Sequence, residues 1–448
     1  MNSRRFKVVL LTVALVLFLH FSLGLEKDNT RYLSGRIAQS QVTPIQERGK
    51  VISVRAFGAK GDGVSDDTAA IQAAINAAKA GETIYFPAGV YDVSDFVVKA
   101  RTGLSFVGEG RKSVIRQKAG AARIATVEKS RDIVISNLTF DANGIVAFGG
   151  VVFYSAIGVR IENNTFVDGA PKPWGESDRN TFMFARGSEP SRDIKVSNNT
   201  IEDLQLDFNH AQRVVIDRNV LKRGGKTAGI GIYTEGDNAI AENFQITNNT
   251  VIDPIGAGFY VGIDPPTDGK CIFRGITLAD NQVIRTRTSG YGILVGTSNN
   301  SIKTTGNVFE NIVIKNNSFR TELGAPQPTQ LIMANTTNRA GIIFTRMTVS
   351  GNKIENERQN GSGYAIDLRG IQNSLVRDNT IKRAANGISL SGDLLSNEVR
   401  DNVVEASEVA YAVEGSLGGN KTANNRIVGN PSQRWMLSKL QSSDSVGQ

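Results

Sequence analysis

Short alternations of apolar and polar residues recur along this chain from about residue 130 onward. Examples are IENNTF at Ile161, VSNNTI at Val196 and ITNNTV at Ile246. Alternation of period two predicts β-strands. In each unit an asparagine precedes the final apolar pair, at Asn164, Asn199, Asn219, Asn249, Asn281, Asn317, Asn352, Asn379, Asn402 and Asn425, so the units lie 20 to 36 residues apart.

This spacing predicts an all-β solenoid. The shortest spacings match about one turn of a parallel β-solenoid, and the longer ones add loop insertions. A second short strand with a glycine at its entrance precedes many units, as in GIGIY at Gly229 and GFYVGI at Gly258. We therefore expect three strands per coil, wound into a single-stranded right-handed parallel β-helix. We also expect the recurrent asparagines to occupy left-handed turn positions and to bond to one another along the axis.

The stretch FGAKGDGVSDDT, from Phe57 to Thr68, resembles a phosphate-binding glycine loop but has no third glycine and no Lys-Ser/Thr pair. The sequence therefore argues against a nucleotide site. A helical apolar stripe follows over Thr68 to Ala80, with Asp66 and Asp67 expected as caps. Because the open end of a solenoid must be covered, we interpret the helix, about residues 67–80, as an N-terminal lid.

The N-terminal region also resembles a known superfamily. FGAKGDGVSDDTAAIQAAINAA, followed by GETIYFPAGVYDVS, is similar to the opening of pectate-lyase-like proteins. That superfamily includes polysaccharide lyases, hydrolases, sugar-polymer epimerases and phage tailspikes. The resemblance implies a right-handed parallel β-helix active on polysaccharides, but it does not fix the reaction.

The chain ends predict export. Three basic residues precede an apolar run from Val8 to Leu19, which is typical of a secretory signal over residues 1–24, with an N-terminal membrane anchor as the alternative. Residues 25–49 are interpreted as a spacer, 50–430 as the β-helix and 431–448 as a tail. The single cysteine, Cys271, excludes an internal disulfide and is expected to be buried.

Charge narrows the choice of partner. The formal net charge is +8, and removal of residues 1–24, which contain three basic and no acidic residues, leaves +5. The basic residues are scattered, which does not favour nucleic-acid binding, whereas an extracellular anionic polysaccharide fits a mild positive excess. The sequence makes no prediction of oligomeric state.

The candidate site lies on three successive coils. In LQLDFNH the residues Leu204, Leu206 and Phe208 are expected to point inward, leaving an acid, an amide and the only histidine after the leader outside. An imidazole has an unperturbed pKa of about 6.5 and can act as a base at neutral pH. The predicted catalytic residues on the first two coils are Asp207, His210, Tyr233 and Glu235.

Other polar and aromatic residues near these strands are predicted to bind substrate. A tryptophan on the first long insertion suits sugar stacking, and an arginine suits a carboxylate. The predicted substrate-binding residues are Trp174, Arg186, Asn209, Asp237, Tyr260, Asp264 and Lys270. No cofactor is certain; calcium is possible through Asp264 and Asp268, although their spacing matches no calcium loop. Asp367 and Arg369 share one outward face and are interpreted as a surface ion pair.

Three functions fit this pattern. The first is lyase or C5-epimerase chemistry on a uronate-containing polysaccharide. The stretch DFNH resembles the Asp-Pro-His strand end of alginate C5-epimerases, with one extra residue before His210 and Gln205 where a tyrosine is expected. The second is glycoside hydrolysis by a carboxylate pair, Asp207 with Asp264 or Glu235. The third is a non-catalytic polysaccharide-binding or surface protein.

Overall fold

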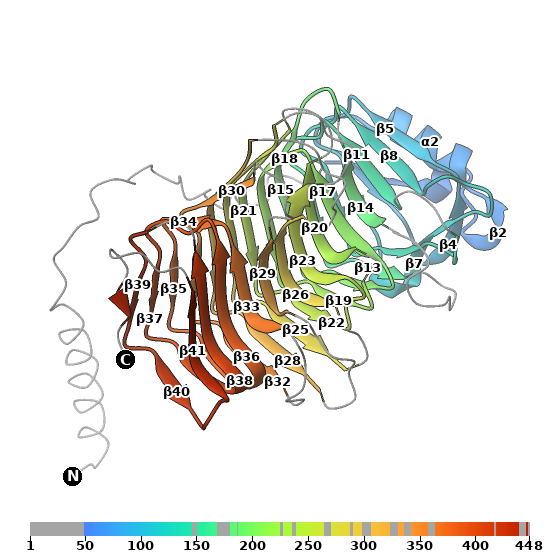
Figure 1. Ribbon diagram of the computed structural model, residues 1–448. Coiled ribbons are helices and arrows are strands. Elements are labelled where there is room, and N and C mark those ends of the chain that lie inside the picture. Colours follow the sequence, from blue (N-terminus) through green and yellow to red (C-terminus); the bar gives the residue numbers. More distant parts are fainter. Residues whose placement is uncertain are drawn as a thin grey trace, which may run out of the picture. The chain divides into compact units, whose positions relative to one another are not determined.

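The structure is a computed structural model in which the chain divides into two units, Met1–Glu47 and Arg48–Gln448. It describes parts of the second unit: residues 49–145, 150–167, 180–185, 187–224, 227–234, 239–263, 270–286, 290–297, 306–322, 330–335, 342–356, 363–415, 418–438 and 445–446. These residues form successive coils of parallel strands, from α2 and β2 in blue to β40 and β41 in red (Figure 1).

The strands form two hydrogen-bonded sheets, of 17 and 25 strands. The larger one divides over most of its length into a second and a third sheet, so three parallel faces run along the coils, as the three-strand repeat predicts. The first sheet contains β1 (Val51–Ser53), β3 (Thr83–Tyr85), β6 (Ser105–Val107), β9 (Val134–Ser136), β12 (Arg160–Glu162), β15 (Ser191–Ser197), β18 (Ala211–Asp217), β21 (Ile240–Thr247), β24 (Ile272–Ala279), β27 (Asn307–Lys315), β30 (Ile342–Thr345), β31 (Thr348–Ser350), β34 (Ile371–Gln372), β35 (Leu375–Arg377), β37 (Glu398–Arg400), β39 (Lys421–Ala423) and β42 (Ser445–Val446).

The second and third sheets are joined near the C-terminal end by two long strands, β36 (Thr380–Gly392) and β38 (Val403–Gly415), which belong to both. The second sheet otherwise contains β2 (Asp62–Asp66), β4 (Gly89–Val93), β7 (Ser113–Gln117), β10 (Thr139–Asp141), β13 (Thr165–Val167), β16 (Thr200–Glu202), β19 (Val220–Lys222), β22 (Thr250–Ile252), β25 (Gln282–Arg285), β28 (Ser318–Thr321), β32 (Lys353–Asn356) and β40 (Arg426–Val428).

The third sheet carries the candidate site. Its other strands are β5 (Phe96–Lys99), β8 (Ala125–Glu128), β11 (Val151–Tyr154), β14 (Asn180–Ala185), β17 (Gln205–Asn209), β20 (Ala228–Thr234), β23 (Ala257–Ile263), β26 (Tyr291–Gly296), β29 (Ile332–Asn335), β33 (Tyr364–Arg369) and β41 (Gln433–Ser438). Two short 3-10 helices, η1 (Val54–Phe57) and η2 (Gly110–Lys112), interrupt the N-terminal coils.

The apolar interior is continuous from coil to coil. The predicted inward residues of β17, Leu206 and Phe208, are fully buried in it. Aromatic rings stack along the axis: Phe184 lies between Phe153 and Phe208, with ring centroids 4.5 and 5.0 Å away. Such contacts add about 0.5–1.5 kcal/mol per pair beyond area burial. Repetition of one side-chain type in successive coils thus fixes the register of the strands.

The recurrent asparagines form an unbroken ladder, as predicted. The side-chain amide of each one from Asn164 to Asn402 donates to the side-chain oxygen of the next, at 2.9–3.1 Å, ending at Asn425. The expectation that these asparagines themselves are left-handed is wrong. The residue before each one has positive φ instead, for example Asn198 (56°) and Gly351 (64°). That turn directs the following side chain inward, where it can stack.

The helix α2 runs from Thr68 to Ala77, three residues shorter than expected, and lies at the N-terminal end of the stack (Figure 1). Ile71 and Ile75 are buried in the interior cluster. Asp66 accepts the Thr68 N–H at 3.0 Å, as a cap does. Asp67 does not cap through its side chain: this buried carboxylate accepts the backbone N–H groups of residues 60 and 61 at 2.7 and 3.0 Å. The glycine stretch is therefore closed by its own acid.

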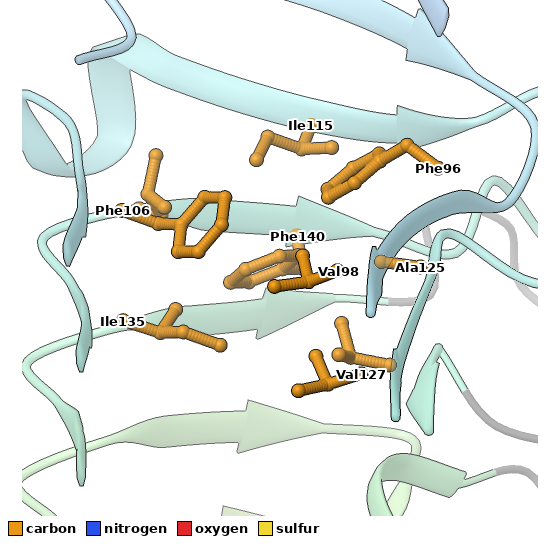
Figure 2. Close-up of a pocket in the computed structure, with 10 residues that line it drawn as sticks. Phe96, Val98, Phe106, Ile115, Ala125, Val127, Ile135 and Phe140 are labelled. Atoms are coloured by element: carbon orange, nitrogen blue, oxygen red, sulfur yellow. The ribbon is translucent and has the colours of Figure 1, made fainter. Parts of the chain in front are cut away.

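A small cavity of about 20 Å³ lies inside the N-terminal coils. Figure 2 shows the apolar side chains that line it, among them Phe96, Phe106 and Phe140. A buried water needs two to four polar partners, and this lining offers none. The cavity is thus a packing gap between coils and not a ligand site.

The sheets continue beyond residue 430. Strand β41 pairs with β38, and the Trp435 ring stacks on Tyr411 with centroids 4.5 Å apart. Trp435 therefore lies against the preceding coil, so part of the segment interpreted as a tail continues the sheet. Cys271 is buried and forms no disulfide, as predicted.

Candidate functional site

The strand β17 places a polar row on the outer face of the third sheet. Its inward residues alternate with Gln205, Asp207 and Asn209, which lie outside the interior cluster. A solvated outer face would leave these side chains exposed, but the three residues are only 2–5% exposed. The Gln205 side-chain amide donates to the Asp207 carboxylate at 2.8 Å. A buried carboxylate held by an amide has a fixed orientation, which suits a site more than a solvated face.

The next two strands add a pair of tyrosines to this row. Asn209 pairs in register with Tyr233 on β20, and Asp207 pairs with Gly231. On β23, Tyr260 is in register with Gly231, and Tyr233 with Gly262. The two rings lie 5.2 Å apart at 50° and form an outer cluster separate from the interior.

Two glycines make room for these rings. A Cβ added to Gly231 would lie 2.1 Å from the Tyr233 ring and 2.5 Å from its hydroxyl. A Cβ added to Gly262 would lie 2.3 Å from the Tyr260 ring. Each ring therefore lies along its own strand, over the glycine two residues away. Because Gly231 is paired with Asp207, the Tyr233 hydroxyl is returned to the level of that carboxylate.

The Tyr260 hydroxyl is held by the backbone of its own strand and of the next one. Tyr260 faces two backbone carbonyls, those of Ile263 and Gly296, at 3.2 Å each. This hydroxyl is thereby held by the backbone. Tyr233 is 6% exposed, and its ring packs against the Tyr260 ring.

His210 ends the β17 row. Its φ is +56°, a left-handed conformation, and its backbone N–H donates to the Tyr233 carbonyl at 3.4 Å. The residue is partly exposed. The turn therefore follows Asn209 directly at the strand end, and its backbone is bonded to that of Tyr233.

The structure thus brings together five predicted residues, Asp207, Asn209, His210, Tyr233 and Tyr260. Lys270 is exposed and precedes β24 in the first sheet, so it is not on this face. The remaining predicted residues lie outside the described part of the chain: Trp174, Arg186, Glu235, Asp237, Asp264 and Asp268. Sequence reasoning missed Gln205 as a partner of Asp207 and the two glycines. The signal for the glycines was their spacing of two from a tyrosine, which puts both on one strand face.

The interpreted ion pair is also present. The Arg369 guanidinium donates to Asp367 at 3.0 Å on β33. Asp367 lies in the same outward row as Asp207, five strands along the sheet. Its carboxyl side chain is 3% exposed, so the pair is not merely a surface contact.

The described residues contain no group of three acidic, histidine or cysteine side chains able to hold a metal, and the two acids considered for calcium, Asp264 and Asp268, lie outside them. Nor do the described residues include a helix long and apolar enough to span a membrane.

Comparison with known families identifies the N-terminal half of the coils. Residues 51–266 match the family model described as rhamnogalacturonase A/epimerase, pectate lyase-like. Residues 331–436 match one described as periplasmic copper-binding protein (NosD). This second segment contains neither histidine nor cysteine. The chain carries a pectate-lyase-like domain.

Two relatives come from Azotobacter vinelandii. Mannuronan C5-epimerase AlgE1 is 41% identical over 107 residues, covering 20% of this chain and 8% of that protein. Alginate lyase 7 is 42% identical over 107 residues, covering 20% of this chain and 12% of the lyase. The matched stretch is therefore a small part of each relative.

A solved structure agrees over most of the chain. The exopolygalacturonase from Thermotoga maritima has 14% sequence identity and a TM-score of 0.55, covering 86% of this chain and 93% of that one. This likeness confirms the fold, a right-handed parallel β-helix.

Proposed function

We propose that this protein removes the C5 proton of a uronate residue in an acidic polysaccharide, at the outer face of β17, β20 and β23. The observation that carries the proposal is the register of β17 and β20, which sets Asn209 beside Tyr233 while Gly231 lets the tyrosine lie back toward Asp207. In this proposal a base, a hydroxyl and a carboxylate act together on one sugar residue. The epimerase and lyase relatives support this chemistry because both reactions can begin with loss of that proton.

The proton beside a sugar carboxylate is removed only if the developing negative charge is stabilised. Asp207, through a proton shared with the sugar carboxylate, and the Asn209 amide supply that stabilisation. His210 takes the C5 proton, and the electron pair of the C–H bond moves into the carboxylate. The Gln205 amide keeps the Asp207 carboxylate turned to the substrate.

Tyr233 then decides the product. If its hydroxyl gives a proton to C5 from the opposite face, the sugar is epimerised and the chain stays intact. If it gives the proton to the glycosidic oxygen at C4, the C4–O bond breaks, a C4=C5 double bond forms and the chain is cleaved. In both cases the proton held by His210 returns to the tyrosinate through solvent.

Glycoside hydrolysis fits the described face less well. Its two carboxyl groups must lie about 5 to 9.5 Å apart. On the described strands flanking β17, which are β14 and β20, no outward position carries a second carboxylate. The next acid of this row after Asp207 is Asp367, five strands and about 24 Å away at 4.8 Å per strand.

Proton NMR in heavy water tests the proposal. The protein is incubated with mannuronan, mixed alginate and polygalacturonate, and binding to each polymer is measured in parallel. We expect either deuterium at C5 in an intact chain or olefinic signals of a C4=C5 bond. New reducing ends with neither change would contradict the proposal in favour of a hydrolase. A polymer that is bound but unchanged would leave the protein a binding scaffold for it.

A further inference from the structure

A second polar group lies on the outer face of the third sheet, on β29, β33 and β36. We call it the Arg369 cluster; its members are Asn335, Asp367, Arg369, Ser389 and Ser391. Asp367 pairs in register with Ser389, and Arg369 with Ser391. Asn335 follows Ala334, whose partner Leu368 precedes Arg369, so the amide and the guanidinium are neighbours.

The charged pair of this cluster is fixed from both sides. Asp367 accepts the Arg369 guanidinium at 3.0 Å and the Gln330 amide at 3.3 Å. A buried carboxylate needs such partners, because an unpaired buried charge is costly. Arg369 is still 43% exposed in its side chain. The guanidinium is therefore oriented by the protein and reachable from solvent.

Two polar atoms of the cluster remain unused within the described part of the chain. Asn335 Oδ1 and Arg369 Nε are buried, and neither has a hydrogen-bond partner. One is an acceptor and the other a donor. Native proteins satisfy more than about 90% of buried polar groups, so an adjacent unsatisfied pair calls for a ligand.

The cluster also contains a basic side chain, which the other outward positions of these described strands lack. Outward positions of the described strands from β8 to β33 carry no lysine and no arginine other than Arg369. Its charge is cancelled by Asp367, which would repel a second carboxylate. A neutral group that both donates and accepts is the better match, and neighbouring hydroxyls of a sugar ring have this property.

We propose that the Arg369 cluster binds a pair of neighbouring sugar hydroxyls of the polysaccharide, about 24 Å along the sheet from Asp207. One hydroxyl accepts from Arg369 Nε, and the other donates to Asn335 Oδ1. The inference rests on the proposed polysaccharide substrate. It makes binding depend on chain length, because only a polymer long enough to span five strands contacts both sites.

The test is affinity electrophoresis in gels containing long alginate, or oligomers too short to span 24 Å. The double variant Asp367→Asn/Arg369→Gln keeps polar side chains of similar size and removes the charge pair. We expect its Kd for long alginate to rise about tenfold, with oligomer binding unchanged. The matched control, Glu355→Gln/Arg383→Gln, removes a 2.7 Å ion pair on the second sheet and should bind as wild type.

A second variant guards against loss of folding. Ser391→Leu places an apolar side chain beside Arg369 at a partly exposed position and removes no buried group; it should weaken long-chain binding in the same way. Unchanged long-chain binding in both variants, as a structural water at the cluster would give, overturns the inference. So does failure of the wild-type protein to bind any polymer. Binding without C5 exchange overturns the proposed chemistry alone.

Discussion

The asparagine ladder and the outer face of the third sheet are both built by stacking one residue per coil, yet they differ in what is stacked. The ladder repeats asparagine in ten successive coils, and each amide finds the next. The outer row changes at every strand, from Met183 through Asp207, Gly231 and Tyr260 to Leu294. The repeated asparagines satisfy backbone hydrogen-bonding groups at the turn of each coil, whereas the varied outer row places chemically different side chains next to one another.

The ladder therefore serves the stability of the β-helix, and the outer row of the third sheet can serve its chemistry. A ladder residue has identical neighbours above and below, so it makes the same bonds everywhere and adds rigidity. Proton transfer needs an acid, a base and a charge stabiliser together. Only the varied row can supply them, and it does so between β17 and β23.

The largest expected effect is a loss of turnover when His210 is replaced. Its φ of +56° favours asparagine as the replacement, since Asn tolerates the left-handed region. Loss of a general base costs about 10²- to 10⁴-fold, so we expect His210→Asn to lower kcat by that factor with an unchanged melting temperature. Initial rates of C5 exchange on mannuronan measure it.

A matched control for this change is Arg213→Asn, a left-handed position (φ +53°) on the first sheet. It should keep wild-type turnover. If His210→Asn and Arg213→Asn have equal rates, His210 is not the base.

The ladder should respond in stability instead. Asn249→Ala removes the acceptor of the Asn219 backbone N–H and side-chain amide, and the donor to Asn281. Each buried group left unsatisfied costs about 1–3 kcal/mol, so we expect a loss of about 3 kcal/mol. Urea unfolding measures it. The same substitution at Asn425, the partly buried end of the ladder, should cost less; equal losses at the two sites would argue against a cooperative ladder.

A smaller effect on turnover is expected at Gly231. The added methyl of Gly231→Ala would lie 2.1 Å from the Tyr233 ring, which must swing away from Asp207. We expect kcat to fall about tenfold or more, with less change in KM, because positioning acts in the transition state. In the double variant Gly231→Ala/Tyr233→Phe the loss should equal that of Tyr233→Phe alone. Additive losses would show that Gly231 acts independently of the tyrosine.

The smallest expected effect is a pH dependence of stability near α2. Lys118, with hydrogen bonds from Thr68, lowers the pKa of Asp66 to about 2. Its folded pKa lies below the unfolded value, so its stabilisation is present above about pH 4 and lost as pH falls toward 2. Because the side chain is 43% exposed, we expect under about 1 kcal/mol. Wild type and Asp66→Asn should therefore differ in melting temperature at pH 6 and converge at pH 2; a constant difference would contradict this origin.

Much of the fold could be predicted because the repeat of each coil can be read directly from the amino-acid sequence. The asparagine spacing alone indicated coils, sheets and the ladder, since the same contact recurs in each coil. The left-handed turn was assigned one residue late because asparagine often adopts that conformation, and both positions are often asparagine, as at Asn198 and Asn199.

The site was less accessible from sequence. The alternation of inward and outward residues predicted that Asp207 and Tyr233 lie on one face. The burial of that face, and the position of the Tyr233 ring over Gly231, depend on the register between strands. Likewise, Asp67 had the position of a helix cap, and only the fold of residues 58–63 turned its carboxylate to the loop. Contacts between coils thus decide what a local pattern leaves open.

The most direct measurement is C5 proton exchange on mannuronan in heavy water by Tyr233→Phe and Tyr154→Phe. Both tyrosines occupy the same outward row, three strands apart, and the Tyr154 hydroxyl accepts a hydrogen bond from the Arg123 guanidinium at 3.4 Å. Because the Tyr233 hydroxyl gives the proton that completes either product, its loss should reduce deuterium incorporation with inversion at C5, or elimination, at least 100-fold, while Tyr154→Phe keeps the wild-type rate. Equal rates in the two variants would contradict the assignment of chemistry to β17, β20 and β23.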